Sequence, residues 1–340
     1  MKTIKLSYIQ EVLNNTDPKF IEGIAKESKK ITQQYFGRTI SLYAPLYLSN
    51  YCSSQCTYCG FGSQNRINRF KLTHKEIQKE MDCISTEGIE NILLLTGESY
   101  KATPLSYLED AVTIAKNYFP NISLEIHPLE ENEYHKLFLA GVDGLTIYQE
   151  TYNKNIYKQV HLSGKKADYN YRLQTPLRAA NAGIRSISLG ILLGLSEASE
   201  DLFCLFSHLN EMEKTFPGIE YSFSFPRLRP KKGQKPFTNS INNATFTKII
   251  CLARILFPRV GINLSTRESA NFRNHALEFG ITKISAGSNT SVGGYTLKNI
   301  EEQNPQFDIE DTRSVNEMIK TLKNRQFDPV LTDWRRIENE

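Results

Sequence analysis

The chain has 340 residues, and its 41 Lys and Arg against 37 Asp and Glu give a net charge of only +4. It holds no run of about 18 apolar residues, and its first residues include acids and amides where a secretion signal needs an unbroken apolar stretch, so we expect neither a membrane span nor secretion. The densest basic run, Arg227 to Lys235, lacks aromatic residues and does not indicate nucleic-acid binding. We therefore expect a cytoplasmic protein, in which clustered cysteines more often bind metal than form disulfides.

Short β-branched or aliphatic runs alternate with longer amphipathic stretches, a pattern typical of repeated βα units around a parallel sheet. One such stretch places Ile77, Met81 and Ile84 on one helical face. The runs predict eight strands, at Ile40–Leu48, Ile89–Leu95, Ile122–Ile126, Gly144–Tyr148, Ile184–Leu193, Ile219–Phe225, Val260–Leu264 and Thr282–Ala286.

Eight βα units predict an α/β protein with a single (β/α)8 barrel of the TIM type over residues 39–292. Residues 1–38 are expected to form an N-terminal helical segment, and residues 293–340 a C-terminal extension packed on the barrel. No low-complexity tract or linker interrupts the pattern, so we expect one barrel domain.

Polar residues gather where the predicted strands end. In this fold the chemistry is built from the loops at the carboxyl ends of the strands. Those ends read CSSQCTYC, TGES, EIHP, YQETYN, LLGL, SFPRLRP, STRES and SAGSN. Thiols, carboxylates, arginines and hydroxyls therefore meet on one rim, which a purely structural barrel would not require.

Three cysteines, Cys52, Cys56 and Cys59, lie within eight residues after the first predicted strand. An iron-sulfur cluster usually takes four thiolates, so three can hold a four-iron cluster only with one iron left open. An open iron is a place where a substrate can bind.

Zinc is the alternative for this motif, and a structural zinc site needs four protein ligands. The next cysteine, Cys83, falls within a helix-like stretch, and His74 at its start stays open as a fourth ligand. Cys83, Cys204 and Cys251 are otherwise expected to be small residues of the core.

The spacing Cys-x3-Cys-x2-Cys, with Tyr58 before the last cysteine, resembles the signature of the radical S-adenosylmethionine (SAM) enzymes. The resemblance implies one 4Fe-4S cluster held by the three cysteines, with SAM on the open iron as the source of a 5'-deoxyadenosyl radical. Thr96, Gly97 and Glu98 resemble the Gly-Gly-Glu stretch that meets the methionine ammonium group, with Thr in place of the first Gly.

Other cofactor contacts follow from the same resemblance. Arg178 resembles the arginine that biotin synthase-like relatives use for the methionine carboxylate, and its alternative role is that of a solvated helix residue. Ribose hydroxyls need acceptors, which either Glu125 or Glu150 could supply.

The likeness extends over most of the chain, from roughly Thr39 to Trp334. The segments PLYLSNYC, CGF, LLLTGE, YQETYNKNIY, HLSGKK, SFPRLRP, LSTRE and SAGSNTSVGGY together resemble the 2-iminoacetate synthase family, the tyrosine lyases of bacterial thiamine biosynthesis. That resemblance implies cleavage of the Cα–Cβ bond of L-tyrosine to 2-iminoacetate (dehydroglycine) and p-cresol. It also implies two partners, thiazole synthase and an electron donor such as flavodoxin or ferredoxin.

A tyrosine lyase has to hold the substrate carboxylate, for which a guanidinium with two parallel hydrogen bonds is well suited. Arg227 and Arg229 are our candidates, because residues two apart in an extended segment point the same way. Arg267 and Glu268 could instead pair with each other or with the substrate. Further candidates for substrate contact or for phenol deprotonation are Ser285, Ser288, Tyr148 and His127.

Other functions remain open at this point. A biotin synthase-like enzyme would need ligands for a second cluster, as would a hydrogenase-maturation tyrosine lyase, whose second cluster takes a C-terminal cysteine pair. The last cysteine here is Cys251, and none follows from Leu252 to Glu340, so we expect a single cluster. A non-catalytic iron-sulfur or zinc-binding module is the third alternative.

Overall fold

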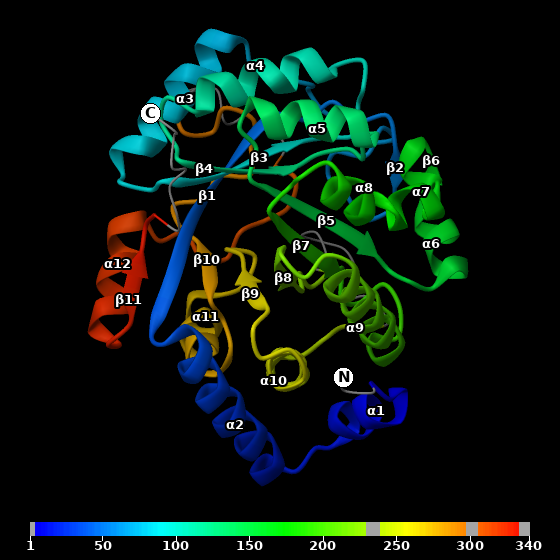
Figure 1. Ribbon diagram of the computed structural model, residues 1–340, viewed down its shortest axis with the longest axis vertical. Helices are drawn as coiled ribbons and strands as arrows, with labels where there is room; N and C mark the ends of the chain where they lie inside the picture. Colours follow the sequence, from blue (N-terminus) through cyan, green and yellow to red (C-terminus); the bar gives the residue numbers. More distant parts are fainter. Residues whose placement is uncertain (1–3, 229–238, 297–304, 333–340) are drawn as a thin grey trace.

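The centre of the structure, a computed structural model that describes residues 4–228, 239–296 and 305–332, is a barrel of parallel strands (Figure 1). The strands follow the order β1-β3-β4-β5-β7-β8-β9-β10, and β10 pairs back to β1, which closes the barrel. Their bounds are β1 Thr39–Ser49, β3 Asn91–Thr96, β4 Asn121–Glu125, β5 Gly144–Glu150, β7 Ser186–Ile191, β8 Glu220–Ser224, β9 Gly261–Leu264 and β10 Lys283–Ser285. The predicted fold class and all eight strands are thus confirmed, each within two residues at either end.

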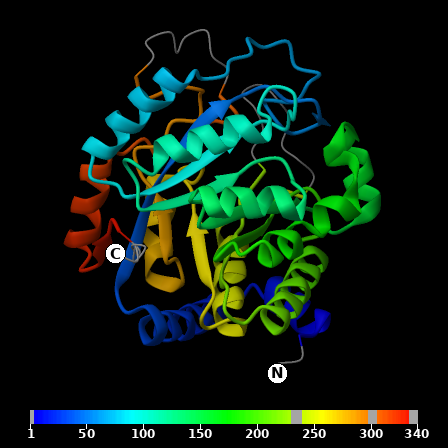
Figure 2. The same cartoon turned by 45° about the horizontal axis from the view of Figure 1, so that its top comes forward.

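Helices cover the outside of the barrel (Figure 2). They are α3 His74–Thr86, α4 Leu105–Ala115, α5 Glu131–Ala140, α6 Lys154–Val160, α7 Tyr169–Leu173, α8 Thr175–Asn181, α9 Ala198–Thr215, α10 Asn243–Leu256, α11 Ala270–Ala276 and α12 Val315–Asn324, with single turns of 3-10 helix at Lys165–Ala167 and Leu277–Phe279. Among the described residues, none of the helices combines the length and apolar character needed to cross a lipid bilayer.

Helix α3 shows how sequence fixes these elements locally. Thr73 accepts a hydrogen bond from the backbone N–H of Glu76, whose side chain in turn accepts from the Thr73 N–H, so a capping box starts the helix. Ile77, Met81 and Ile84 are buried against the barrel, as their helical spacing predicts.

Two features were not predicted from sequence. Strand β2 (Gln55–Cys56) pairs antiparallel with β6 (His161–Ser163), and this small ribbon lies outside the barrel sheet. Strand β11 (Asp328–Val330) adds a ninth strand beside the start of β1. Both are two or three residues long, which is too short for an apolar pattern to reveal.

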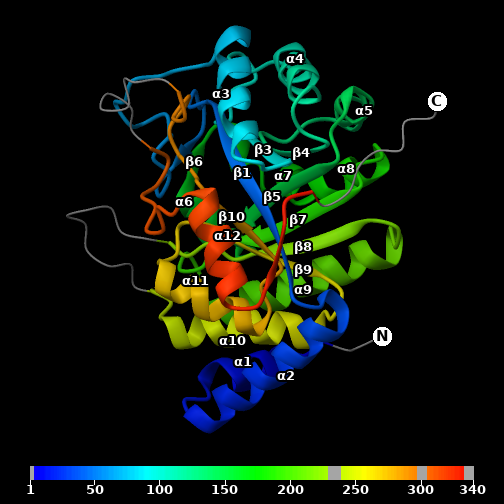
Figure 3. The same cartoon turned by 90° about the vertical axis from the view of Figure 1, so that its left-hand side faces the viewer.

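The N-terminal helices α1 (Leu6–Asn14) and α2 (Pro18–Phe36) lie beneath α10 at the amino-terminal end of the barrel (Figure 3). Ser28 of α2 donates to the carbonyl oxygen of Phe279 at 2.8 Å, and the Lys248 ammonium of α10 donates to the carbonyl oxygen of Asn15 at 2.9 Å. The helical segment is therefore attached at the end of the barrel opposite the strand-end rim.

Candidate active site

A cavity of about 400 Å³ opens at the carboxyl ends of the barrel strands. Its lining brings together residues that are far apart in the sequence but were singled out there by their strand-end position. The predicted site residues that line it are Cys52, Cys56, Tyr58, Cys59, Thr96, Gly97, Glu98, Glu125, Tyr148, Glu150, Arg267, Ser285 and Ser288.

The cysteines lie on a loop that begins at the end of β1 and includes the short strand β2. Arg69 holds this loop by donating to the carbonyl oxygens of Asn50 at 2.7 Å, Phe61 at 2.6 Å and Gly62 at 2.8 Å. Three charge-assisted hydrogen bonds to backbone leave the loop little freedom, so its thiols are held before any ligand binds. Sequence reasoning missed Arg69.

The three thiols line one part of the cavity and do not converge on one point. Among the described residues, no three His, Cys, Asp or Glu side chains are close enough to hold a single metal ion. His74, the fourth ligand of the zinc alternative, pairs instead with Asp110, with 3.3 Å between Nε2 and Oδ2. Burial raises the pKa of Cys56 to about 12, so a thiolate here needs positive charge beside it, which a metal cluster supplies. The residues present thus fit a multi-atom cluster better than one zinc ion.

The Thr96-Gly97-Glu98 stretch follows β3 and lies directly against the cysteine loop. The Gly97 N–H donates to the carbonyl oxygen of Ser49, and an added Cβ at Gly97 would collide with the carbonyl oxygen of Tyr51. Only glycine fits this close approach of two backbones. The approach places Glu98 next to Cys52 and its neighbours.

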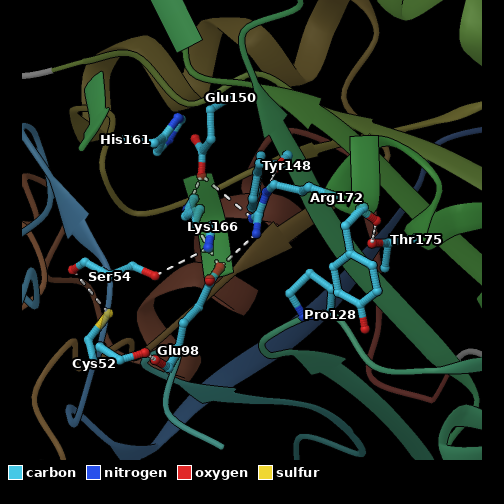
Figure 4. A network of polar contacts seen from close by, with 12 residues as sticks. Cys52, Ser54, Glu98, Pro128, Tyr148, Glu150, His161, Lys166, Arg172 and Thr175 are labelled. Carbon is cyan, nitrogen blue, oxygen red and sulfur yellow. Dashed lines mark hydrogen bonds and ion pairs between the residues drawn. The ribbon is translucent and has the colours of Figure 1, made fainter. Parts of the chain in front are cut away.

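A buried arginine and a largely buried lysine lie between two buried carboxylates in this cavity (Figure 4). Arg172 donates from Nη1 to Glu98 Oε1 at 2.6 Å and from Nε to the carbonyl oxygen of Tyr148 at 2.6 Å. Lys166 donates to Glu150 Oε1 at 2.7 Å and lies 3.9 Å from Glu98 Oε1. Neither cation was among the predicted site residues.

The two carboxylates of this network differ in how far their oxygen atoms are already bonded. Burial disfavours charge on Glu150, but Lys166 and Arg172 outweigh it and hold the pKa of Glu150 below its usual value. Glu98 Oε2 is buried and has no hydrogen-bond partner among the described residues. A buried carboxylate oxygen without a partner is costly, so this atom is suited to receive a ligand donor.

Glu125 lies at the end of β4 on the same cavity, but no Lys or Arg among the described residues is bonded to it. Burial, helped by the negative charge of Glu150, raises its pKa from 4.5 to about 7. Burial likewise raises the pKa of Tyr148, whose hydroxyl donates to Ser224 Oγ at 3.1 Å. Glu125 is therefore a carboxyl group that can gain or lose a proton near neutral pH.

Tyr58 is fixed by a histidine that the sequence did not indicate. The Tyr58 hydroxyl lies 2.8 Å from His161 Nε2, and His161 Nδ1 lies 3.0 Å from the carbonyl oxygen of Tyr157. A carbonyl only accepts, so Nδ1 carries the proton and Nε2 accepts from Tyr58. Burial lowers the pKa of His161 to about 3, which keeps the ring neutral.

The predicted arginines divide into those inside and those outside the cavity. Arg178 does not line it, because its guanidinium donates to the carbonyl oxygens of Leu129 at 2.8 Å and Tyr171 at 2.9 Å. Arg172, six residues earlier, takes the position toward the cavity. Arg229 lies outside the described residues.

Arg227 is also outside the cavity lining, since it is buried in an ion pair with Glu268 and donates from Nη1 to the carbonyl oxygen of Ile241 at 2.9 Å. Glu268 therefore pairs with Arg227, where the sequence had suggested Arg267. Arg267 faces the cavity, stacks over the Phe307 ring at 3.7 Å, and its buried Nε has no hydrogen-bond partner among the described residues.

The remaining candidates differ in their access to the cavity. The Ser285 hydroxyl accepts from the Thr266 N–H at 3.1 Å, and the Ser288 hydroxyl is buried without a partner among the described residues. His127 is buried outside the lining, 4.0 Å from the Tyr100 ring centroid, and burial lowers its pKa to about 4. His127 is thus not part of the wall of this cavity.

The C-terminal extension supplies part of the cavity wall, which sequence reasoning did not predict. Gln306, Phe307, Asp308 and Glu310 belong to the lining. Gln306 accepts from the Tyr47 hydroxyl at 2.8 Å through its side chain and from the Gly60 N–H at 3.3 Å through its backbone. The extension therefore connects the barrel mouth to the cysteine loop.

The other cysteines lie on helices away from the cavity lining. Cys251 in α10 is fully buried, as expected of a core residue, whereas Cys83 in α3 and Cys204 in α9 are only partly buried.

Comparison with known families divides the chain into two matched parts. Residues 46–203 match the Radical SAM superfamily, and residues 224–328 match the Biotin and Thiamin Synthesis associated domain.

Individual relatives match over nearly the whole chain. The chain is 40% identical over 316 residues to 2-iminoacetate synthase of Salmonella typhimurium, which covers 93% of this chain and 83% of that protein. It is 38% identical to 2-iminoacetate synthase of Escherichia coli K12 over the same shares. Among solved structures, HydG, a maturase of the FeFe-hydrogenase, is 32% identical with a TM-score of 0.91, covering 98% of this chain and 74% of HydG.

Proposed function

This chain belongs to the 2-iminoacetate synthase family, and from that membership and the cavity we infer that its barrel mouth is the active site of a radical SAM tyrosine lyase. The enzyme cleaves the Cα–Cβ bond of L-tyrosine to 2-iminoacetate and p-cresol for thiamine thiazole synthesis. One observation carries this conclusion: 40% identity over 93% of the chain to a 2-iminoacetate synthase. The thiols and carboxylates on one cavity agree with it.

Cys52, Cys56 and Cys59 would hold one 4Fe-4S cluster, since they are the cysteines that line the cavity among the described residues. When bound, the cluster and SAM supply the 5'-deoxyadenosyl radical that starts the reaction. The chain itself holds the loop that carries the thiols through the hydrogen bonds of Arg69 to loop carbonyl oxygens.

Glu98 and Arg172 are proposed to bind the methionine end of SAM. The unpartnered Glu98 Oε2 can accept from the ammonium group. Arg172 replaces Arg178 as our candidate for the carboxylate, because its Nη2 makes only a 3.8 Å contact with Glu150 and retains donors that face the cavity.

The two remaining carboxylates are proposed to have separate roles. Glu150 is held ionised by Lys166 and Arg172, so it is the better acceptor for ribose hydroxyls. Glu125 has a pKa of about 7 and shares the cavity with Arg267, so we assign it to the tyrosine, where it can take a proton from the phenol.

Arg267 is our candidate clamp for the tyrosine carboxylate. Of the predicted arginines that the structure describes, it is the one on the cavity, and its Nε has no partner there. The Ser288 hydroxyl, also unpartnered, lines the same wall and can share the contact. A carboxylate fixed by Arg267 keeps the amino group in one position, which is the main contribution of a site that works by orientation.

We further propose thiazole synthase and a flavodoxin- or ferredoxin-type electron donor as partners and the cytoplasm as location. The imine product hydrolyses in water, so a consumer has to be near. Thiols that bind metal also need a reducing compartment.

Anaerobic reconstitution with iron and sulfide, followed by addition of SAM, L-tyrosine and dithionite, tests the proposal. We expect p-cresol and 5'-deoxyadenosine in equal amounts. The Cys56→Ala protein is the control and should form neither. SAM cleavage without p-cresol under saturating tyrosine would contradict the tyrosine lyase assignment.

A further inference from the structure

Positive charge is concentrated in the two segments that form the cysteine loop and its neighbour. Residues 51–75 and 151–167 contain no Asp or Glu, although the chain as a whole has nearly as many acids as bases. Their eight basic residues are Arg66, Arg69, Lys71, Lys75, Lys154, Lys158, Lys165 and Lys166. An acid-free stretch of this kind sets the local charge independently of the small net charge of +4.

The two segments meet at the β2–β6 ribbon, where the strands lie side by side (Figure 1). The Thr57 N–H donates to the carbonyl oxygen of Val160 at 3.0 Å, and the Lys166 N–H donates to Ser54 Oγ at 3.4 Å. Cys56 belongs to the ribbon and pairs with His161. A partner on the outside of the ribbon would therefore be separated from the cysteines by little more than one layer of backbone.

The basic residues of the two segments differ in where their side chains lie. Arg69 and Lys166 point inward, to the loop carbonyls and to Glu150. Arg66, Lys158 and Lys165 are exposed. The nearest acid in sequence, Asp168, accepts from the Tyr171 N–H at 2.9 Å as the cap of α7.

The same two segments also carry exposed apolar side chains. Leu162 on β6 has 60% of its surface exposed, and Tyr51, next to Cys52, has 40% exposed. We call Tyr51, Arg66, Lys158, Leu162 and Lys165 the ribbon surface. Exposed apolar residues in segments that carry only basic charges are suited to a transient protein interface, whereas phosphate-binding surfaces need no exposed Leu.

We propose that the ribbon surface docks an acidic one-electron carrier protein, which reduces the centre held by the cysteines. This inference rests on the proposed function, because the reaction needs an electron at that centre. The carrier loses one electron and the cysteine-bound centre gains it, with no bond made or broken in the chain. Charge complementarity favours an acidic carrier, since it speeds encounter and orients the partner over the ribbon.

The test compares two reductants for one enzyme. The reconstituted protein receives SAM and L-tyrosine with one of two reductants, either reduced flavodoxin, a small acidic flavoprotein, or dithionite. The readout is the rate of p-cresol formation with flavodoxin divided by the rate with dithionite. Arg66→Glu/Lys158→Glu reverses two exposed charges that do not line the cavity. Lys19→Glu/Lys30→Glu makes the same charge change on α2, at the opposite end of the barrel, as the matched control.

We expect the ratio to fall about tenfold or more in Arg66→Glu/Lys158→Glu at low ionic strength and to stay at the parental value in the control. The parental rate with flavodoxin should also fall more steeply with added salt than the dithionite rate, because flavodoxin carries many charges and dithionite is a small dianion. Dividing by the dithionite rate removes any effect of the substitutions on the site itself.

An unchanged ratio would overturn the proposal. The proposal would also fail if Arg66→Glu/Lys158→Glu bound a heparin column less tightly than the parental protein while its ratio of rates stayed parental. The basic residues would then serve to bind a polyanion. Parental protein that forms no p-cresol with dithionite would refute the proposed function instead, and the ratio would then be measured on SAM cleavage.

Discussion

Arg172 and Glu98 are joined by a 2.6 Å hydrogen bond across the barrel mouth, although they are 74 residues apart in sequence. Glu98 comes from the end of β3, and Arg172 comes from α7, in the long connection between β5 and β7. The same guanidinium donates to the carbonyl oxygen of Tyr148 at 2.6 Å, so it is oriented from two sides. A cation fixed in this way can hold a ligand carboxylate without first losing its own conformational freedom.

Arg172→Ala should weaken SAM binding. Loss of one charge-assisted contact costs on the order of 1.5–3 kcal/mol, or roughly tenfold to a hundredfold in Kd. Arg178→Ala is the comparison, and it should lower the Tm while changing the Kd for SAM less than about threefold, because Arg178 donates to backbone. Equilibrium binding of SAM to the reconstituted proteins, with melting curves, checks both. A raised Kd for SAM in Arg178→Ala with a parental Kd in Arg172→Ala would instead assign the methionine carboxylate of SAM to Arg178.

Replacing any one of Cys52, Cys56 and Cys59 with Ala should abolish the visible charge-transfer absorption and SAM cleavage together. Cys83→Ala and Cys204→Ala are matched controls, since neither residue lines the cavity, and both should keep iron content and cleavage at parental values. Iron analysis and 5'-deoxyadenosine formation provide the measurements. A loop variant that keeps both properties would remove the cluster assignment.

The sequence predicted the fold and the strand-end and cysteine-loop residues that line the cavity. Strand ends are readable because apolar runs stop where polar residues begin, which is how Glu98, Glu125 and Glu150 were found. The cysteine loop was readable because the spacing of its thiols is tied to the cluster. Both signals are local, so they need no knowledge of how distant segments meet.

The lining residues that the sequence did not indicate reach the cavity through contacts between distant segments. Lys166 and Arg172 lie in a connection rich in lysine and tyrosine, where nothing marks an inward-facing cation. Gln306 reaches the site only because the extension crosses the barrel mouth, where a Cβ on Gly60 would lie 2.6 Å from its carbonyl oxygen. The sequence placed Arg227 at the substrate for the same reason. Its pairing with Glu268 depends on how the loop after β8 meets the loop after β9, which no local pattern shows.

Arg267→Ala should raise the KM for L-tyrosine at least tenfold, because one carboxylate contact to a cation is worth about 1.5–3 kcal/mol. SAM cleavage in the absence of tyrosine should stay near the parental rate. Arg229→Ala, at the residue outside the described part of the chain, tests the competing clamp. A parental KM in Arg267→Ala with a raised one in Arg229→Ala would reassign the clamp.

Arg227→Ala should act on stability and leave tyrosine binding to the folded protein unchanged. It would leave Glu268 buried without its main partner, and breaking a buried pair costs on the order of 3–5 kcal/mol. Urea unfolding measures the loss. An unchanged free energy of unfolding with a raised KM would show that Arg227 contacts substrate after all.

Glu125→Gln should change how stability depends on pH. Burial raises the pKa of Glu125 from 4.5 to about 7, so between these values the unfolded chain releases this proton while the folded chain keeps it. This group therefore lowers the free energy of unfolding as pH rises from about 5 to 7, by on the order of 2–3 kcal/mol. Buried His161 and His127, whose pKa values are lowered, act in the opposite direction.

The measurement for Glu125 is thus a difference between two proteins. Urea unfolding of the parental and Glu125→Gln proteins without cofactor, at pH 5 and pH 7.5, should show the variant gaining relative stability at the higher pH. Equal gains at both pH values would mean that folding does not raise the pKa of Glu125, and the reason for assigning this residue to the phenol proton would fail.

The number of clusters decides where the reaction stops. A hydrogenase-maturation tyrosine lyase needs a second cluster to convert dehydroglycine to carbon monoxide and cyanide. In this chain Cys251 is fully buried in α10, and no cysteine occurs from Leu252 to Glu340. His275, the histidine within that stretch, bonds through Nδ1 to the carbonyl oxygen of Asn271 at 2.8 Å, on the surface of α11.

The reconstituted 340-residue protein should therefore bind about four irons per chain, the content of one cluster. Given L-tyrosine, SAM and reductant, it should release p-cresol, 5'-deoxyadenosine and glyoxylate, the hydrolysis product of the imine, and no carbon monoxide or cyanide. Iron analysis, chromatography and a cyanide assay on one sample make the comparison. About eight irons per chain, or cyanide in proportion to p-cresol, would show that the chain carries out the second reaction as well.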